Sequence, residues 1–149
     1  MKIFVVDASV AVKWYIPEPC SERAVELLER AAKGDCRLWA PDLIYAEVGN
    51  VLWKKCMRGE IGEEDARKIL GAMVKAFPAS VAGSQALLPA AFEIAYGYRR
   101  TLYDSLYIAL AVAKNGVFIT ADERLVNALL HTSLGPFVRS LKNKTSPGS

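Results

Sequence analysis

The chain has 149 residues, of which 52% are hydrophobic and 23% are charged, a composition typical of a compact globular protein and unlike that of a disordered one. A chain of this length forms one domain that buries roughly two thirds of its unfolded surface, with no room for a second. The formal net charge of +3 permits a polyanionic partner but does not establish one.

No part of the sequence has the pattern of a membrane or export segment. No charge-free apolar stretch reaches the ~18 residues that a membrane-spanning helix needs, and Met1-Lys2 leads directly into a strand-like run instead of a signal-peptide core. The three cysteines, Cys20, Cys36 and Cys56, are an odd number without a CxxC spacing, which favours reduced thiols over a disulfide framework. We therefore expect a cytoplasmic protein.

Strands and helices alternate along the chain. Two apolar runs rich in β-branched and aromatic residues, 3–6 (IFVV) and 117–120 (VFIT), predict central parallel strands that are covered on both faces. The 3.6-residue period predicts helices over about 21–33, 42–58, 63–77, 86–99 and 104–115. Short edge strands are expected near 37–40 and 79–82. This alternation favours right-handed crossovers and a three-layer α/β/α sandwich with a mainly parallel central sheet.

Two of these features can be specified further. The third predicted helix places Ala66, Ile69, Leu70, Met73 and Phe77 on one apolar stripe. Residues 143–149 (NKTSPGS) have the composition of a disordered tail, which leaves 1–142 for the domain.

Both central strands end on an acid. Asp7 follows IFVV directly, and Asp122 comes two residues after VFIT. Because the working crevice of an open α/β sheet lies beyond the carboxyl ends of its strands, we expect these two carboxylates to lie at one edge.

Two helices add further acids at the margin of apolar faces. On the helix after Asp42, Glu47 lies about 40° beyond Val51 at the edge of the apolar stripe, and Asn50 lies a further ~60° round, where it could orient the Glu47 carboxylate or a water. Asp104 stands in the first turn of LYDSLYIALAVA, a segment that is apolar nearly all round and therefore buried.

Each acid also has an ordinary explanation. Asp7, Asp104 and Asp122 precede or open helices and could be N-caps, and Glu47 could lie on a solvated face. Four acids from four separated segments are nevertheless hard to explain as independent caps.

The four acids predict a cation site. Two carboxylates ~5 Å apart repel by about 3 kcal/mol at an effective dielectric constant of 20, so such a cluster must hold protons or bind a cation. An all-oxygen ligand set selects Mg²⁺ or Mn²⁺. Zinc is disfavoured because the only histidine, His131, lies outside the set and the cysteines are scattered.

A Mg²⁺ ion held by carboxylates can activate a water and stabilise an in-line phosphodiester displacement, so the site predicts a nuclease. Thr120 lies two residues before Asp122, and its hydroxyl should point to the same side, toward the scissile phosphate or a metal-bound water. Ser9 could act in the same way or cap a helix. Lys13, beside Trp14 and Tyr15, and the arginines Arg99, Arg100 and Arg124 are candidate contacts to a nucleic-acid backbone. The alternative is that Lys13 belongs to an ordinary amphipathic helix and that the arginines lie on solvated faces.

Four motifs spread over nearly the whole chain form an ordered set. They are DASV at Asp7, EVGNVL at Glu47, YDSLYIALA at Asp104 and TADERL at Asp122. Any one of them alone is weak, but the ordered set is specific. It resembles the PIN-domain family, and within it the VapC-like toxins of prokaryotic toxin–antitoxin pairs.

The resemblance implies a single PIN-like nuclease domain with a five-stranded parallel sheet. It also implies a Mg²⁺- or Mn²⁺-dependent ribonuclease in which Asp7, Glu47, Asp104 and Asp122 are the metal-site acids and Thr120 is the accompanying polar residue. Members of the family usually form homodimers and are commonly silenced by a small antitoxin whose tail lies over the active-site groove.

Two other enzyme classes fit the sequence less well. A receiver-type phosphoacceptor would need a third strand-end acid and a lysine after a late strand, and a haloacid-dehalogenase-like phosphatase would need an acid where Ser9 stands. Two alternatives stay open: a catalytically silent PIN-like module that binds RNA or protein, and a housekeeping RNA-processing PIN nuclease.

Overall fold

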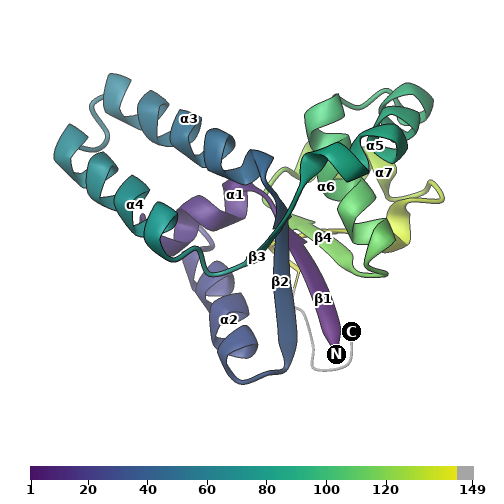
Figure 1. Cartoon of the computed structure of the whole chain (residues 1–149), viewed down its shortest axis with the longest axis horizontal. Helices are drawn as coiled ribbons and strands as arrows, with labels where there is room; N and C mark the ends of the chain where they lie inside the picture. Colours follow the sequence, from purple (N-terminus) through teal and green to yellow (C-terminus); the bar gives the residue numbers. More distant parts are fainter. Residues whose placement is uncertain (144–149) are drawn as a thin grey trace.

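The computed structural model describes residues 1–143, which form a five-stranded, all-parallel sheet (Figure 1). The strands are β1 (Lys2–Val6), β2 (Cys36–Pro41), β3 (Ser80–Ala82), β4 (Val117–Thr120) and β5 (Val138–Ser140). Their order is β3-β2-β1-β4-β5, so the two strands predicted as central are neighbours inside the sheet. Asn143 is described outside the helices and strands, and the rest of the predicted tail lies outside the described residues.

The five longest helices follow the predicted periodic segments closely, whereas the two short ones, Ala8–Ala11 and Glu123–Leu129, were not among them. They are α1 (Ala8–Ala11), α2 (Ser21–Ala32), α3 (Leu43–Met57), α4 (Glu63–Lys75), α5 (Ser84–Tyr98), α6 (Leu102–Ala113) and α7 (Glu123–Leu129), with 3-10 turns η1 (Val12–Trp14) and η2 (Gly135–Phe137). None of the helices in the described part of the chain is long and apolar enough to cross a membrane.

Three details of the expected elements are wrong. Strand β2 is an interior strand and not an edge strand, because Trp39 pairs with β1 on one side and with β3 on the other. Helix α4 ends at Lys75, so Phe77 lies beyond it and packs against Trp14 and Tyr45. Leu70 is exposed, since the buried side chains of α4 are Ala66 and Met73.

The central strands are buried on both faces, which makes the fold a three-layer sandwich. Phe4 and Val6 of β1 pack in a cluster with Leu27 of α2. The intervening residue, Val5, points the other way into a cluster that includes Ile108 of α6. This alternation is the period of a β-strand, and the continuous apolar run reflects helices on both sides of the sheet.

A glycine allows β4 to lie close beside β1. A Cβ atom at Gly116 would stand 2.5 Å from the Ile3 carbonyl oxygen, closer than any real side chain could approach. Gly116 directly precedes β4 and donates its N–H to the Ala111 carbonyl at the end of α6, 2.8 Å away. The missing side chain thus permits the tight passage from α6 into β4.

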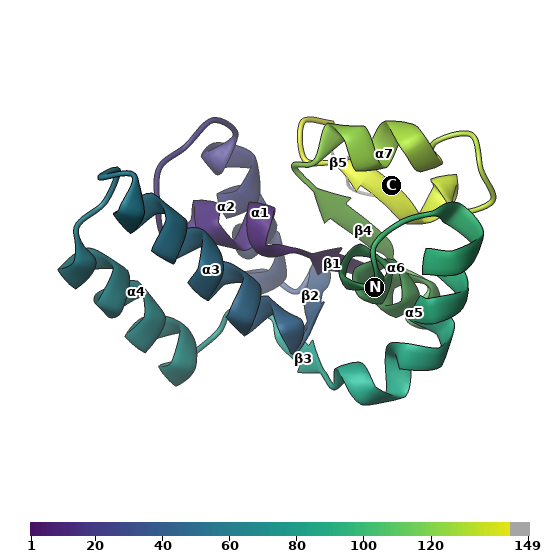
Figure 2. The same ribbon diagram turned by 90° about the horizontal axis from the view of Figure 1, so that it is seen from above.

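Helices gather on two sides of the carboxyl edge of the sheet. Seen from above, α1 to α4 lie on one side and α5 to α7 on the other (Figure 2). Helices α3 and α4 pack against each other and project away from the sheet. The ends of β1 and β4 therefore lie between α1 and α3 on one side and α6 on the other.

Candidate active site

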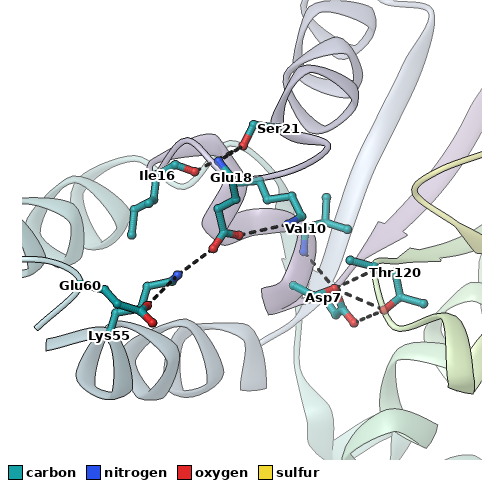
Figure 3. Close-up of polar contacts among 11 residues, drawn as sticks. Asp7, Val10, Ile16, Glu18, Ser21, Lys55, Glu60 and Thr120 are labelled. Atoms are coloured by element: carbon teal, nitrogen blue, oxygen red, sulfur yellow. Dashed lines mark hydrogen bonds and ion pairs between the residues drawn. The ribbon is translucent and has the colours of Figure 1, made fainter. Parts of the chain in front are cut away.

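Asp7 lies at the end of β1 and accepts hydrogen bonds through both carboxylate oxygens. Its Oδ1 accepts from the Ser9 hydroxyl at 2.5 Å and from the Val10 N–H at 3.3 Å, so Asp7 is the N-cap of α1. Its Oδ2 accepts from the Thr120 hydroxyl at 2.6 Å (Figure 3). Three donors from two segments therefore fix the orientation of this partly buried carboxylate.

Thr120 and Ser9 connect Asp7 to the segment after β4. The fully buried Thr120 hydroxyl, which donates to Asp7, accepts the Asp122 N–H at 3.1 Å. The Ser9 hydroxyl accepts the Ala121 N–H at 2.9 Å. Both hydroxyls are thus bonded to protein groups at the site, and they orient the first acid.

Glu47 lies on α3 at the border of the core, as its position on the helix predicts. Its neighbours Ile44 and Val48 are fully buried, whereas Glu47 is partly buried. Asn50 is exposed and lines a cleft of about 420 Å³ together with Glu47. The structure therefore brings this predicted pair to one cavity.

Asp104 is not the N-cap of its helix. The cap of α6 is Thr101, whose hydroxyl accepts the Asp104 N–H at 3.1 Å. Asp104 lies in the first turn and is followed by a buried run from Ser105 to Ala111. The ordinary capping explanation therefore does not account for its side chain.

Asp122 is the most open of the four acids. It is exposed, and its Oδ1 accepts the Leu125 N–H at 3.2 Å, which makes it the N-cap of α7. It lies near enough to Asp104 for its charge to raise the pKa of the Asp104 carboxyl. Asp122 therefore both caps α7 and lies close to another acid of the site, Asp104.

The acids affect one another's protonation. Burial raises the pKa of Asp7 from 3.8 to about 6, against the lowering effect of the hydrogen bonds from Ser9 and Thr120, and the charge of Glu47 adds to the rise. Burial also raises the pKa of Glu47 and of Asp104, with the Asp104 charge adding at Glu47. Three of the four carboxyl groups thus carry a cost for their charge that a cation would relieve.

The donor set suits a hard divalent cation held partly through water. Among residues 1–143, no group of three or more His, Cys, Asp or Glu side chains lies close enough to bind one metal ion directly. Protein sites for Mg²⁺ usually use one or two carboxylates, several waters and substrate phosphates. Here Asp7 and Glu47, Glu47 and Asp104, and Asp104 and Asp122 are neighbouring carboxyl groups, and in each pair the charge of one raises the pKa of the other. Such a pair could bind Mg²⁺ together with waters and a substrate phosphate.

Tyr107 is a residue of the site that the sequence did not reveal. Its ring is buried and stacks on Phe118, with ring centroids 5.5 Å apart. Its hydroxyl is buried and has no hydrogen-bond partner of good geometry within the described part of the chain, and burial together with the nearby Glu47 carboxylate raises its pKa. The one available signal was its position three residues after Asp104, which places both side chains on one side of α6.

The predicted RNA-contacting residues lie in different surroundings. Lys13 is partly buried and forms a 3.1 Å ion pair with Glu18. Arg100 lies close enough to Asp104 to lower the pKa of its carboxyl. Arg99 and Arg124 are exposed.

The three cysteines are free thiols, as expected.

Known proteins resemble this chain in sequence. The model of the PIN domain matches residues 4–128. Ribonuclease VapC3 of Pyrobaculum aerophilum is 38% identical over 122 residues, which cover 81% of this chain and 90% of that protein. Ribonuclease VapC1 of Mycobacterium tuberculosis is 36% identical over 89 residues, or 60% of this chain and 65% of that protein.

Solved structures share the fold. The crystal structure of PAE2754 from Pyrobaculum aerophilum matches with a TM-score of 0.67 at 21% identity and covers 95% of this chain and 85% of that one. The Mycobacterium tuberculosis toxin VapC20, described as cleaving the sarcin-ricin loop, matches with a TM-score of 0.59 at 17% identity over 79% of this chain and 87% of that one. The matched domain, the curated relatives and the shared fold together establish that the chain belongs to the PIN-domain family and is VapC-like.

Proposed function

We propose that the chain is an endoribonuclease that depends on Mg²⁺ or Mn²⁺ and acts as the toxin of a VapBC-type toxin–antitoxin pair. Its sequence relatives are named ribonucleases, and the matched family model is the PIN domain. The observation that carries the proposal is the convergence of acids at the carboxyl edge of the sheet, where burial raises the pKa of Asp7, Glu47 and Asp104.

Asp7, Glu47, Asp104 and Asp122 are the residues that would hold the cation, in part through bound waters, because no three of these side chains lie close enough to bind one ion directly. When bound, a divalent ion supplies an activated water and stabilises the negative charge that develops on the phosphate. Ser9 and Thr120 fix the orientation of the Asp7 carboxylate. The cleft beside Glu47 leaves room for a nucleotide next to the acids.

The direct test is metal-dependent cleavage of RNA. Wild-type protein with Mn²⁺ should cut single-stranded RNA, and EDTA or the change Asp7→Asn should abolish cutting while the fold remains intact. Sequencing the new RNA ends then identifies the target. Binding of RNA without metal-dependent cleavage would overturn the nuclease proposal and favour a silent RNA-binding module.

The toxin role requires a partner. We expect a small antitoxin protein that covers the acid site, and it should block cleavage and protect Glu47 and Asp104 from solvent when the two proteins are co-expressed. Purified antitoxin encoded beside this chain's gene should inhibit the nuclease, and its co-expression should restore growth to cells that express the nuclease. No inhibition by such a neighbour would favour a housekeeping RNA-processing nuclease.

A homodimer is also expected. Phe92 and Tyr96 of α5 are exposed and stack with ring centroids 6.3 Å apart, which supplies apolar surface for a contact between copies. Light scattering should give twice the 16.3 kDa chain mass. A mass of one chain at micromolar concentration would count against the dimer.

A further inference from the structure

One face of α3 connects the acid site to a group of cations. Residues at three- and four-residue spacing share a helix face, and on α3 this face begins at Glu47, continues through Val51 and Lys54, and reaches Arg58 just past the helix end. The rise from Glu47 to Arg58 is about 16 Å at 1.5 Å per residue. The face is therefore acidic at one end and basic at the other.

Two clefts lie along this face and share lining residues. The first, of about 420 Å³, contains Glu47 and Tyr103. The second, of about 350 Å³, contains Ser9 and Arg58. Both are lined by Val51 and Lys54, so the two clefts adjoin along the helix. Together they form what we call the α3 groove, which runs past the acid site.

Glu18 holds two lysines in the second cleft. Its carboxylate pairs with the Lys13 ammonium at 3.1 Å. It also pairs with the Lys55 ammonium at 2.7 Å, and Lys55 pairs with Glu60 at 3.4 Å (Figure 3). The three side chains of the Lys13–Glu18–Lys55 group are only 11–19% exposed, so their geometry is better defined than that of a surface ion pair. Glu18 thus fixes ammonium groups from η1 and α3 beside each other.

The cleft keeps an excess of positive charge. It is lined by four cations, Lys13, Lys54, Lys55 and Arg58, against the single carboxylate of Glu18. Among residues 1–143, Lys54 and Arg58 have no carboxylate within ion-pair distance. Ammonium and guanidinium groups without a protein counter-ion are suited to phosphate oxygens.

We infer that the α3 groove binds the sugar–phosphate backbone of a single RNA strand and leads it to the acid site. The identity of the ligand as RNA rests on the proposed function. A phosphate a few nucleotides from the scissile bond lies beside Lys54 and Arg58, and Glu18 positions Lys13 and Lys55 for the same strand. Tyr103, which is 60% exposed at the rim of the first cleft, offers a ring on which an unpaired base can stack.

The first test measures binding without cleavage. Fluorescence anisotropy with a labelled single-stranded RNA in EDTA compares wild type with Lys54→Gln/Arg58→Gln. We expect at least tenfold weaker binding at physiological salt, and a salt dependence of log K whose slope is lower by about 1.4, which corresponds to two lost phosphate contacts.

The control removes the same charge elsewhere. Lys33→Gln/Lys68→Gln changes two exposed residues, one at the end of α2 and one on α4, that lie outside both clefts. It should change affinity less than threefold. Equal losses of RNA affinity in the two double variants would contradict RNA binding in the α3 groove, because they would show that affinity depends only on the net charge of the protein. A loss of melting temperature without a change in affinity would instead assign Lys54 and Arg58 to stabilising the end of α3.

The variant Glu18→Gln tests whether RNA binding depends on the positions of the Lys13 and Lys55 ammonium groups or only on the net charge of the cleft. This change makes the cleft more positive, so net charge alone predicts tighter binding of RNA. The groove predicts weaker binding, at least threefold, because Lys13 and Lys55 lose their common partner, and circular dichroism should show an unchanged fold. Tighter binding would contradict the positioning role of Glu18.

A second readout distinguishes this inference from the nuclease proposal. In a series of RNAs, each with one uncharged methylphosphonate linkage at a different position, affinity for the wild type should fall at only one or two positions. Affinity for Lys54→Gln/Arg58→Gln should not depend on the position of the uncharged linkage. Such a pattern without metal-dependent cleavage would support RNA binding in the α3 groove and contradict the nuclease proposal. Metal-dependent cleavage without a position-dependent loss of affinity would support the nuclease proposal and contradict RNA binding in the groove. Stronger binding of poly-glutamate than of RNA would reassign the groove to an acidic protein segment.

Discussion

The Thr120 hydroxyl donates a 2.6 Å hydrogen bond to Asp7 Oδ2 and so joins the ends of two neighbouring strands. The two residues are 113 positions apart in the chain. The same hydroxyl accepts the Asp122 N–H, so one buried side chain sets the positions of two of the four acids.

Removing this hydroxyl should damage both stability and the site. Thr120→Val keeps the side-chain shape but leaves the Asp7 oxygen and the Asp122 N–H without this partner. We expect the free energy of unfolding to fall by about 1–3 kcal/mol, the usual cost of unpaired buried polar groups. The pKa of Asp7 should rise further, because the Thr120 hydrogen bond lowers it. Chemical denaturation and NMR titration measure the two effects.

Thr132 supplies a matched control. Its hydroxyl also donates one hydrogen bond, to the Leu129 carbonyl at 2.7 Å, and accepts one, from the Leu134 N–H at 3.2 Å. Thr132→Val should cost similar stability and leave RNA cleavage unchanged. Equal activity of the two variants would show that the Thr120–Asp7 bond does not serve the site.

The raised pKa of Asp7 predicts how stability depends on pH. The folded state holds the Asp7 proton up to about pH 6, whereas the unfolded chain releases it near pH 3.8. The stabilising effect of this proton is therefore complete below about pH 4 and is lost as pH rises through 6. In metal-free protein at pH 7 the cost is about 3 kcal/mol for a shift of roughly two pKa units.

Asp7→Asn removes this dependence. The difference in unfolding free energy between Asp7→Asn and wild type should grow between pH 4 and pH 6 in favour of the variant, then level off. A flat difference for Asp7→Asn would mean that its carboxyl is not buried as described.

The main elements of the fold could be predicted because the residue pattern of each segment agrees with the structure that the segment adopts. IFVV and VFIT are apolar on both faces, and the five long helices keep a 3.6-residue period. Strand β5 has three residues, VRS, and no pattern that separates it from a loop, so only pairing with β4 reveals it. The interior place of β2 is likewise set by its partners and not by its own residues.

The site was predictable only where the residue type is unusual for its position. Asp7 after an apolar strand and Asp104 on an apolar helix are conspicuous in the sequence. Tyr107 and Glu18 are not, because a tyrosine on a buried helix and a glutamate between prolines are ordinary. Their importance comes from tertiary contacts with Glu47 and with Lys13 and Lys55.

The buried Tyr107 hydroxyl predicts a gain in stability on its removal. Tyr107→Phe keeps the ring stack on Phe118 and deletes an oxygen that has no well-aligned hydrogen-bond partner among residues 1–143. The metal-free protein should become more stable by about 1–3 kcal/mol, as measured by chemical denaturation. If the hydroxyl contacts a metal-bound water, the variant should also gain less stability from Mn²⁺. A less stable metal-free variant would show that the hydroxyl already has a partner.

Two glycines should respond in opposite ways to alanine. Gly116→Ala would place Cβ against the Ile3 carbonyl, so we expect the free energy of unfolding to fall by about 1–3 kcal/mol, the usual cost of overpacking. Gly71 lies within α4, and, apart from its chain neighbours and the helix's own backbone, no described atom lies within 4 Å of the position that a Cβ would take there. Gly71→Ala should therefore stabilise the protein by about 0.5–1 kcal/mol. Equal effects in chemical denaturation would contradict the close passage of Gly116 beside β1.

The central claim is that the gathered acids bind a divalent cation, and the melting temperature of wild type and Asp104→Asn with and without Mn²⁺ tests it most directly. Because Thr101 and not Asp104 caps α6, Asp104→Asn should relieve repulsion and raise the melting temperature of the metal-free protein. Mn²⁺ should then raise the melting temperature of wild type but not that of the variant. A variant that is less stable without metal, yet gains as much from Mn²⁺ as wild type does, would contradict the claim.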